Sequence, residues 1–291
     1  MKSRGNLTGF IILFIIGLSI LLYPTVSNLW NQFRDDQLIS QYERSSGTSA
    51  ADNMKEKISE AEAYNKTLIG TTVPDAFSKH EGKTDTVYES LLNSENSGMM
   101  GYVEIPSLNI ELPIYHYTTE EVLSKGAGHL LGSSLPVGGE STHTVISAHR
   151  GLPSAKLFTD LDKVSIGDVF YFHILNKILA YEVDQIKTVE PTDVKDLGIV
   201  NGQDLATLVT CTPYAVNTKR LFVRGHRINF EDAVGIAEEK GKTRTSAQDP
   251  SVWTFIICAA IGAAIALSVI YFAEKKRKYG RKSKEKKKEN Y

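Results

Sequence analysis

The sequence predicts a mainly β domain that is attached to a membrane, and two observations lead to this prediction. Short runs of β-branched and aromatic residues, separated by turn residues, recur from Gly101 to Phe230. Many short strands of this kind are typical of a β-barrel. Dense apolar stretches also lie near both ends of the 291-residue chain, and about 20 apolar residues in a helix span a bilayer.

The N-terminal segment, residues 1–27, is predicted to be a signal peptide or a signal anchor. Its apolar part, Phe10 to Tyr23, follows the positive charges of Lys2 and Arg4, and this layout fits either alternative. The small residues from Thr25 to Ser27 offer a cleavage site, but they do not form the usual A-x-A pattern. We therefore favour an anchor that is not cleaved.

The C-terminal segments predict a membrane span followed by a cytoplasmic tail. Val252 to Ala273 holds 22 residues without a charge, which is enough for a transmembrane helix over residues 252–273. The tail, residues 274–291, contains ten Lys or Arg and three Glu. The positive-inside rule places such a tail in the cytoplasm, so the residues between the two spans are expected to be extracellular.

The charge of the chain is divided unevenly. The whole chain has a net charge of −1, and setting aside about +7 on the tail and +2 at the N-terminus leaves about −10 for the outer region. An acidic domain is a poor partner for nucleic acid, so we expect no nucleic acid to bind. Two explanations of the acidic character remain open, which are binding to cationic partners and ordinary solubility. The basic tail predicts attraction to anionic membrane lipid.

Residues 28–98 predict an N-terminal helical region followed by a loop. Apolar residues recur at helical spacing between Asn28 and Lys66, and the polar break from Ser45 to Ser49 predicts two helices or one interrupted helix. No period is sustained from Ile69 to Gly98. A long loop of this kind in a compact domain is usually functional or mobile.

Residues 99–230 predict the β domain, and residues 231–251 a short helix from Glu231 to Gly241 with a polar linker. A brief helical pattern also covers Ser154 to Leu161. The predicted strands are Gly101 to Ile105, Ile110 to Tyr115, Thr144 to Ala148, Val169 to Ile174, Lys177 to Val189, Leu205 to Cys211 and Arg220 to Phe230.

Cys211 is predicted to be a free thiol. The other cysteine, Cys258, lies within the predicted C-terminal span and cannot reach an extracellular partner. A free thiol is either a nucleophile or an inert buried side chain. His149 and Cys211 each end a predicted strand, and Arg220 begins the next one, so all three side chains can meet at one rim of a barrel. A histidine at a strand end alone is more often structural.

Two sequence blocks resemble the active-site signatures of sortases, the cysteine transpeptidases of Gram-positive cell surfaces. They are TLVTC, which ends at Cys211 nine residues before Arg220, and SAHRG around His149. The resemblance covers Gly101 to Phe230 and implies an eight-stranded β-barrel with N-terminal helices, a lid loop and two membrane spans. The blocks GAGHLLGSSLPVGG, THTVISAHRGLP, KLFTDLDKVSIGD, LAYEVDQI and TLVTCTPYAVNTKRLFVRGHRI resemble the class C, pilin-assembling subgroup.

The resemblance also implies a role for each site residue. Cys211 is the expected nucleophile, which attacks the Thr-Gly bond of an LPXTG-like sorting signal and forms a thioester. His149 is the expected general acid and base, and Arg220 is expected to hold the substrate backbone or the oxyanion. Thr210 is expected to position the site. The acceptor is a pilin lysine, and no cofactor is required because the thioester conserves the energy of the amide.

The subgroup usually carries a lid with an Asp-Pro-aromatic motif over its active site. This sequence has Asp75 and Phe77 at the matching spacing, but Ala76 replaces the proline and Pro74 precedes the aspartate. A proline before the aspartate restrains the entry to the motif, so a looser anchoring geometry is expected. The alternative is a surface turn without a gating function.

Three functions are compatible with these residues. The first is a pilin-polymerising transpeptidase, and the second is a sortase that anchors surface proteins to the peptidoglycan cross-bridge. The third is a membrane-tethered binding or scaffold protein without turnover. The C-terminal span and the Asp75 and Phe77 motif favour the first function. The acidic residues have no calcium-ligand spacing, so no metal site is predicted.

Overall fold

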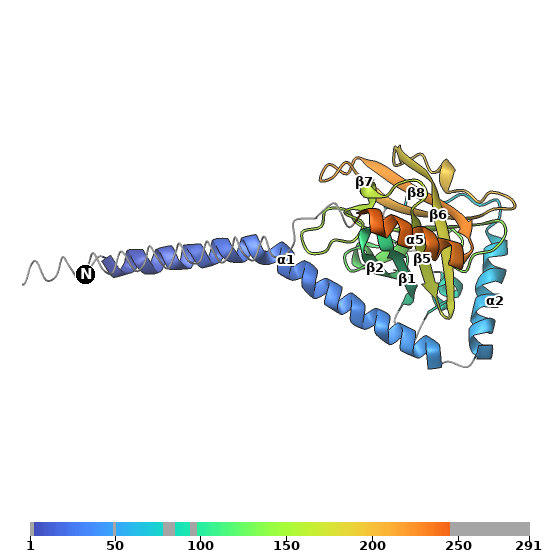
Figure 1. The fold of residues 1–291 in the computed structure, drawn as a ribbon, viewed down its shortest axis with the longest axis horizontal. Coiled ribbons are helices and arrows are strands. Elements are labelled where there is room, and N and C mark those ends of the chain that lie inside the picture. Colours follow the sequence, from blue (N-terminus) through green and yellow to red (C-terminus); the bar gives the residue numbers. More distant parts are fainter. Residues whose placement is uncertain (1–2, 49–50, 78–84, 94–97, 245–291) are drawn as a thin grey trace, which may run out of the picture. The chain divides into compact units, whose positions relative to one another are not determined.

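The computed structural model describes residues 3–48, 51–77, 85–93 and 98–244. A closed eight-stranded β-barrel forms the centre of the compact unit Pro24–Arg244 (Figure 1). The predicted mainly β fold class is therefore confirmed. The predicted span 252–273, the tail 274–291 and the linker from residue 245 onward lie outside the described residues. The strands are β1 (Met99–Ile105), β2 (Ile110–His116), β3 (Ala127–His129), β4 (Thr142–Ser147), β5 (Val169–Ile174), β6 (Lys177–Val189), β7 (Asp204–Thr212) and β8 (Lys219–Ile228).

The strand order around the barrel is β1-β2-β3-β4-β7-β8-β6-β5. Two neighbouring pairs, β2 with β3 and β4 with β7, are parallel, and the other pairs are antiparallel. Because β4 and β7 run in the same direction, both end at one rim of the barrel. The antiparallel strand β8 begins at that rim. The residues that directly follow β4 and β7 therefore lie close together at this rim.

The interior of the barrel is a packed core. Buried apolar side chains from every part of the barrel wall form one cluster, which includes Phe170, Phe172 and Tyr181. An eight-stranded barrel encloses a space just wide enough for side chains to fill. A substrate is therefore expected to bind at the rim or on the outer surface, where loops and strand ends supply polar groups.

Four helices pack against the barrel or connect its strands: α2 (Ala51–Thr67), α3 (Thr86–Ser90), α4 (Glu120–Leu123) and α5 (Phe230–Arg244). The amide of Asn65 in α2 donates to the Leu135 carbonyl at 3.0 Å and accepts from the Leu135 N–H at 2.7 Å. Helix α5, which lies across β5 and β6 in Figure 1, buries Ala233 against Val169 and Tyr171. The predicted helix from Glu231 to Gly241 is thus confirmed.

The helix α1 (Ser3–Thr48) supplies the first part of the chain. Its stretch Ile12–Gly47 is the one candidate membrane span among the described residues, by length and composition. Apolar side chains such as Leu13 and Ile20 are exposed there, as lipid contact requires. Further along the helix, the Tyr42 hydroxyl donates to the Met100 carbonyl at 2.8 Å. The helix is thus suited to membrane anchoring at one end and bound to the barrel at the other.

Three local predictions are wrong. Ser154 to Leu161 forms turns instead of a helix, and only a 3-10 helix, Leu161–Lys163, follows them. The expected loop from Ile69 to Gly98 contains α3, which begins because the Asp85 carboxylate accepts from the N–H groups of two residues in its first turn. Strand β3 is missing from the prediction, since its three residues are too few to show an alternation.

Two buried histidines link the barrel wall to its loops. Nε2 of His129 lies 2.8 Å from the Ser134 carbonyl, and its Nδ1 lies 2.8 Å from the Tyr88 hydroxyl. Nδ1 of His143 lies 2.8 Å from the Gly198 carbonyl, and its Nε2 lies 2.7 Å from the Thr207 hydroxyl. A carbonyl only accepts, so each ring donates from one nitrogen and accepts at the other, as a neutral imidazole does. Burial lowers the pKa of both rings from 6.5 to about 4.

Because of these two histidines, we expect the free energy of unfolding to decrease in mild acid. The unfolded state takes up protons below pH 6.5, whereas the folded rings stay neutral until about pH 4, so stability falls as the pH drops through this interval. At pH 5 the loss is about 2 kcal/mol for each ring. Urea unfolding of the full chain in detergent at pH 7 and pH 5 measures it. His143→Gln should lose about half of this pH dependence, whereas the exposed-ring control His226→Gln should keep all of it.

Candidate active site

The register of β7 and β8 brings the predicted thiol and guanidinium together. Cys211 pairs directly with Arg220 across the two antiparallel strands, and directly opposite residues point to the same face of a sheet. Nη1 of Arg220 lies 3.6 Å from Sγ of Cys211. Both side chains are largely buried, and Cys211 is a free cysteine.

His149 reaches the same rim from β4. Ser147 at the end of β4 pairs with Val209 of β7, and the Ala148 N–H continues the ladder by donating to the Val209 carbonyl at 3.2 Å. His149 follows directly, where the ladder ends. The structure therefore brings His149, Cys211 and Arg220 to one rim, as the sequence predicts.

The Thr210 side chain joins the ends of strands β4 and β7. Its hydroxyl donates to the Ala148 carbonyl at 2.8 Å, and the side chain is fully buried. The bond joins the residue before Cys211 to the residue before His149. Leaving a buried hydroxyl without its hydrogen-bond partner destabilises the fold by about 1 kcal/mol or more. This bond therefore keeps the ends of β4 and β7 at a fixed distance.

Asp75 lies directly on the guanidinium of Arg220. Its Oδ1 accepts from Nε at 2.9 Å and its Oδ2 accepts from Nη2 at 2.8 Å. A two-point bond between a planar guanidinium and a carboxylate fixes both groups in orientation. Arg220 thus faces Cys211 with one nitrogen and Asp75 with the other two.

The Phe77 ring contacts both His149 and Arg220. Its ring centre lies 5.8 Å from that of His149, and the Arg220 guanidinium carbon lies 5.0 Å from the Phe77 ring centre. Val73 and Ala76, on either side of Asp75, are buried in an apolar cluster with residues of the barrel. The segment that carries Asp75 and Phe77 therefore packs closely on the barrel, and Ala76, which stands where the lid motif usually has proline, contributes to that packing.

The electrostatics of this arrangement keep the thiol protonated. Burial raises the pKa of Cys211, the Arg220 cation lowers it, and the Asp75 carboxylate raises it again, so the pKa lies above its usual value. For Arg220, burial lowers the pKa, but the hydrogen bonds that it donates to Asp75, together with the charges of Cys211 and Asp75, outweigh this effect and leave the pKa raised. The thiolate is the reactive form of cysteine. With Asp75 in place, the site therefore holds Cys211 in its less reactive form.

Two further side chains, which the sequence analysis did not single out, contact the site. Glu120 of α4 places both carboxylate oxygens 3.3 Å from Nε2 of His149. Arg150 joins the loop after β4 to the end of β7, since it donates to the Thr159 carbonyl and to the Thr212 hydroxyl, each at 3.1 Å, and also to Asp162. Glu120 lies 29 positions before His149 in a region without a motif, so no sequence signal marks it.

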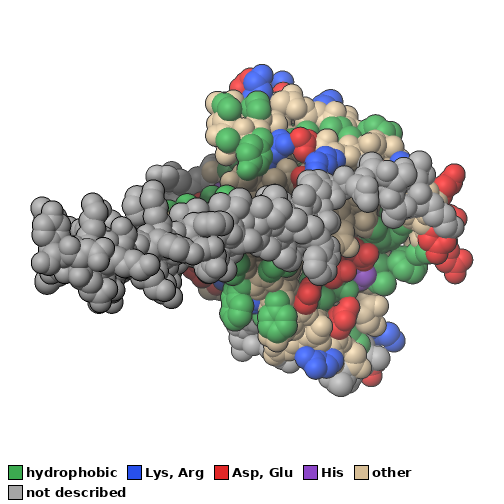
Figure 2. Space-filling view, turned by 60° about the vertical axis from the view of Figure 1, so that its left-hand side comes forward, with side chains coloured by type: hydrophobic (Ala, Val, Ile, Leu, Met, Phe, Trp, Pro, Cys, Tyr) green, Lys and Arg blue, Asp and Glu red, His purple; other side chains and the backbone are tan. Residues whose placement is uncertain are grey.

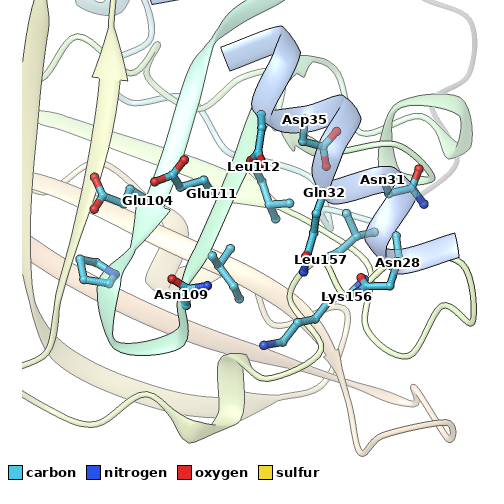
Figure 3. Close-up of a pocket in the computed structure, with 14 residues that line it drawn as sticks. Asn28, Asn31, Gln32, Asp35, Glu104, Asn109, Glu111, Leu112, Lys156 and Leu157 are labelled. Atoms are coloured by element: carbon cyan, nitrogen blue, oxygen red, sulfur yellow. The ribbon is translucent and has the colours of Figure 1, made fainter. Parts of the chain in front are cut away.

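A second polar feature lies outside this site. A pocket of about 260 Å³ separates α1 from the turn between β1 and β2, and Asp35, Glu104 and Glu111 contribute carboxylates to it (Figure 3). Burial raises the pKa of Asp35 to about 6, and the bond from Arg34 offsets only part of this effect. None of the three predicted catalytic side chains lines this pocket.

Acidic side chains also gather on part of the molecular face in Figure 2. Calcium and magnesium bind to clusters of such oxygen ligands. Within the described ranges, however, no group of three or more His, Cys, Asp or Glu side chains is placed to hold a metal ion.

Comparisons with known proteins agree with this geometry. The model of the sortase domain matches residues 103–228. The solved structure of sortase C from Streptococcus pneumoniae is 46% identical with a TM-score of 0.64, and the match covers 67% of this chain and 97% of that chain. The structure of sortase C1 from Streptococcus agalactiae is 42% identical with a TM-score of 0.61, and the match covers 67% of this chain and 96% of that chain.

A curated relative is more distant. Sortase A of Streptococcus agalactiae is 27% identical over 236 residues, which are 77% of this chain and 88% of that protein. The higher identity to the sortase C structures extends over nearly their whole length. The chain therefore belongs to the sortase family of cysteine transpeptidases, and within that family it is a class C sortase.

Proposed function

We propose that this sortase polymerises pilins by transpeptidation, with Cys211 as nucleophile, His149 as general acid and base, and Arg220 as the group that holds the substrate. The observation that carries the proposal is the contact of Arg220 with Cys211 at the rim reached by His149. The similar sortase C of Streptococcus pneumoniae is described in terms of pilin substrate specificity, and one of group B Streptococcus as pilus-related.

The first half-reaction breaks the Thr-Gly amide of an LPXTG-like signal. The Cys211 sulfur attacks the threonine carbonyl carbon while His149 takes the thiol proton, and the resulting oxyanion is stabilised by the permanent positive charge of Arg220. The carbon–nitrogen bond then breaks while His149 gives a proton to the departing glycine amine. The product is a thioester between Cys211 and the shortened pilin.

The second half-reaction uses the amine of a pilin lysine. The neutral amine attacks the thioester carbonyl, His149 accepts a proton from the nitrogen, and the carbon–sulfur bond breaks. Cys211 is released and an isopeptide bond joins the two pilins. The thioester conserves the free energy of the broken amide, so the cycle requires no cofactor.

Asp75 and Phe77 act as a lid in this proposal. Asp75 occupies two of the Arg220 nitrogens, and the Phe77 ring lies tilted beside His149, so a substrate carbonyl cannot use these two nitrogens until this segment moves away. Its departure also removes the carboxylate that raises the pKa of Cys211. Opening thus exposes the thiol and favours the thiolate in one movement.

The proposal places the catalytic domain on the outer side of the membrane. The apolar part of α1 anchors the N-terminus, while residues 252–273 form the second span and residues 274–291 a cytoplasmic tail that attracts anionic lipid. Pilins carrying sorting signals are expected to be anchored in the same membrane, so substrate and enzyme meet at its outer surface.

The lid predicts faster modification of the thiol in lid variants. Asp75→Ala and Phe77→Ala should raise the alkylation rate of Cys211 by iodoacetamide at pH 7 about three- to tenfold, because the thiol becomes accessible and its pKa falls. Mass spectrometry of timed samples of the full chain in detergent measures the rate. Asp184→Ala is the matched control, since Asp184 makes a similar two-point bond to Arg224, at 2.9 and 3.1 Å. Equal rates in all variants would rule out the lid.

The transfer reaction itself is tested with an LPXTG peptide and a pilin that offers acceptor lysines. We expect a Cys211 thioester in the first step and a lysine isopeptide in the second, both identified by mass spectrometry. Cys211→Ala should abolish both products, and Arg220→Lys should lower the rate at least about tenfold, because a lysine loses the forked donor geometry. Transfer only to a cross-bridge analogue would support wall anchoring, and no adduct at all would support a scaffold without turnover.

A further inference from the structure

Glu120 is the charged side chain that contacts the histidine of the site. Both of its carboxylate oxygens lie 3.3 Å from Nε2 of His149. The His149 side chain is only 19% exposed, whereas that of Glu120 is 81% exposed. The imidazole is therefore held in a partly buried position with Nε2 directed outward at a carboxylate.

The fold places Glu120 there through the parallel crossover between β2 and β3. Ser147 of β4 pairs with Gly128 of β3 in antiparallel register, so the chain beyond Ser147 passes the residues that precede β3. Helix α4 lies in that segment. Thr119 caps it by accepting from the Val122 N–H at 3.3 Å, and this cap orients the first turn that carries Glu120.

The carboxylate determines which ring nitrogen carries the proton. An ionised carboxylate only accepts hydrogen bonds, so Nε2 must be the donor. In a neutral imidazole the other nitrogen then has a free lone pair. Nδ1 of His149 is accordingly the atom that can accept a proton from the attacking lysine and return one to a leaving amine.

The two arginines of the site bond to groups other than the His149 ring. The Arg220 guanidinium is bound to Asp75, and the Phe77 ring contacts both the guanidinium and the imidazole. The side chain of the adjacent Arg150 bonds to Thr159, Asp162 and Thr212. Among the described side chains, Glu120 alone makes a polar contact with the His149 ring.

We infer that Glu120 is a positioning residue that holds His149 with its proton on Nε2 and leaves Nδ1 for proton exchange with the substrate. The inference rests on the proposed transpeptidation and adds a fourth side chain to it. Because Glu120 is exposed and the contacts are long, its contribution is smaller than that of a buried catalytic carboxylate. Contacts with an exposed charged side chain contribute at most about 1 kcal/mol, which corresponds to about two- to fivefold in rate.

Three variants of the full chain in detergent test the inference. Glu120→Ala removes the acceptor, Glu120→Gln keeps an amide oxygen that can still accept from Nε2, and Glu121→Ala is the matched control. Glu121 is the next residue of α4, is 85% exposed and pairs with Lys125 instead of with His149. Nitrogen NMR of the imidazole in protein labelled with ¹⁵N-histidine reports the protonated nitrogen, with His149→Gln to assign the signal.

We expect the wild type, Glu120→Gln and Glu121→Ala to show His149 protonated on Nε2, and Glu120→Ala to show a mixture of the two tautomers. In the LPXTG peptide assay, kcat of Glu120→Ala should fall about two- to fivefold with KM unchanged, and Glu120→Gln should recover part of it. A wild-type proton on Nδ1, or Glu120→Ala indistinguishable from Glu121→Ala in both measurements, would overturn the inference. A wild type that forms no thioester would instead overturn the proposed function, while the NMR comparison still decides the role of Glu120.

Discussion

The guanidinium of Arg220 is the group on which the resting site depends. One nitrogen faces the Cys211 sulfur and two others hold the Asp75 carboxylate. A planar fork of donors satisfies several partners at fixed angles, which an ammonium cannot do. In the closed arrangement Arg220 therefore links the strand that carries the nucleophile to a segment 145 positions earlier in the chain. The same donors are the ones that the proposed reaction assigns to the substrate.

The barrel supplies the precision that this shared use of Arg220 requires. Cys211 and Arg220 lie opposite each other on paired strands, and the parallel pairing of β4 with β7 brings the chain leading to His149 to the same rim. The buried Thr210 hydroxyl joins these strand ends. Sites built on strands hold their geometry better than sites built on loops. The proposed lid movement is assigned to the segment around Asp75, which lies outside the barrel wall.

Sequence patterns predicted the parts of this structure that depend on regular alternation or on a motif. The long strands β6 and β7 show clear β-type runs, and the trio at the rim follows from two short blocks around His149 and Cys211. Strand β3 was missed because three residues show no period. Glu120 was missed because an exposed glutamate in the first turn of a helix is common, and only the crossover between β2 and β3 brings it to His149. The contact of Asp75 with Arg220 is likewise a product of tertiary structure.

The packing of Val73 and Ala76 against the barrel has a further consequence for the proposed activity. The lid is part of the same chain, so it competes with substrate at an effective concentration that does not change when the enzyme is diluted, and short tethers give values of about millimolar. A sorting signal free in solution is at a disadvantage against such a competitor. A signal held in the same membrane is itself confined to a thin layer, and local crowding of pilins, more than their total amount, then determines how often Arg220 changes partner.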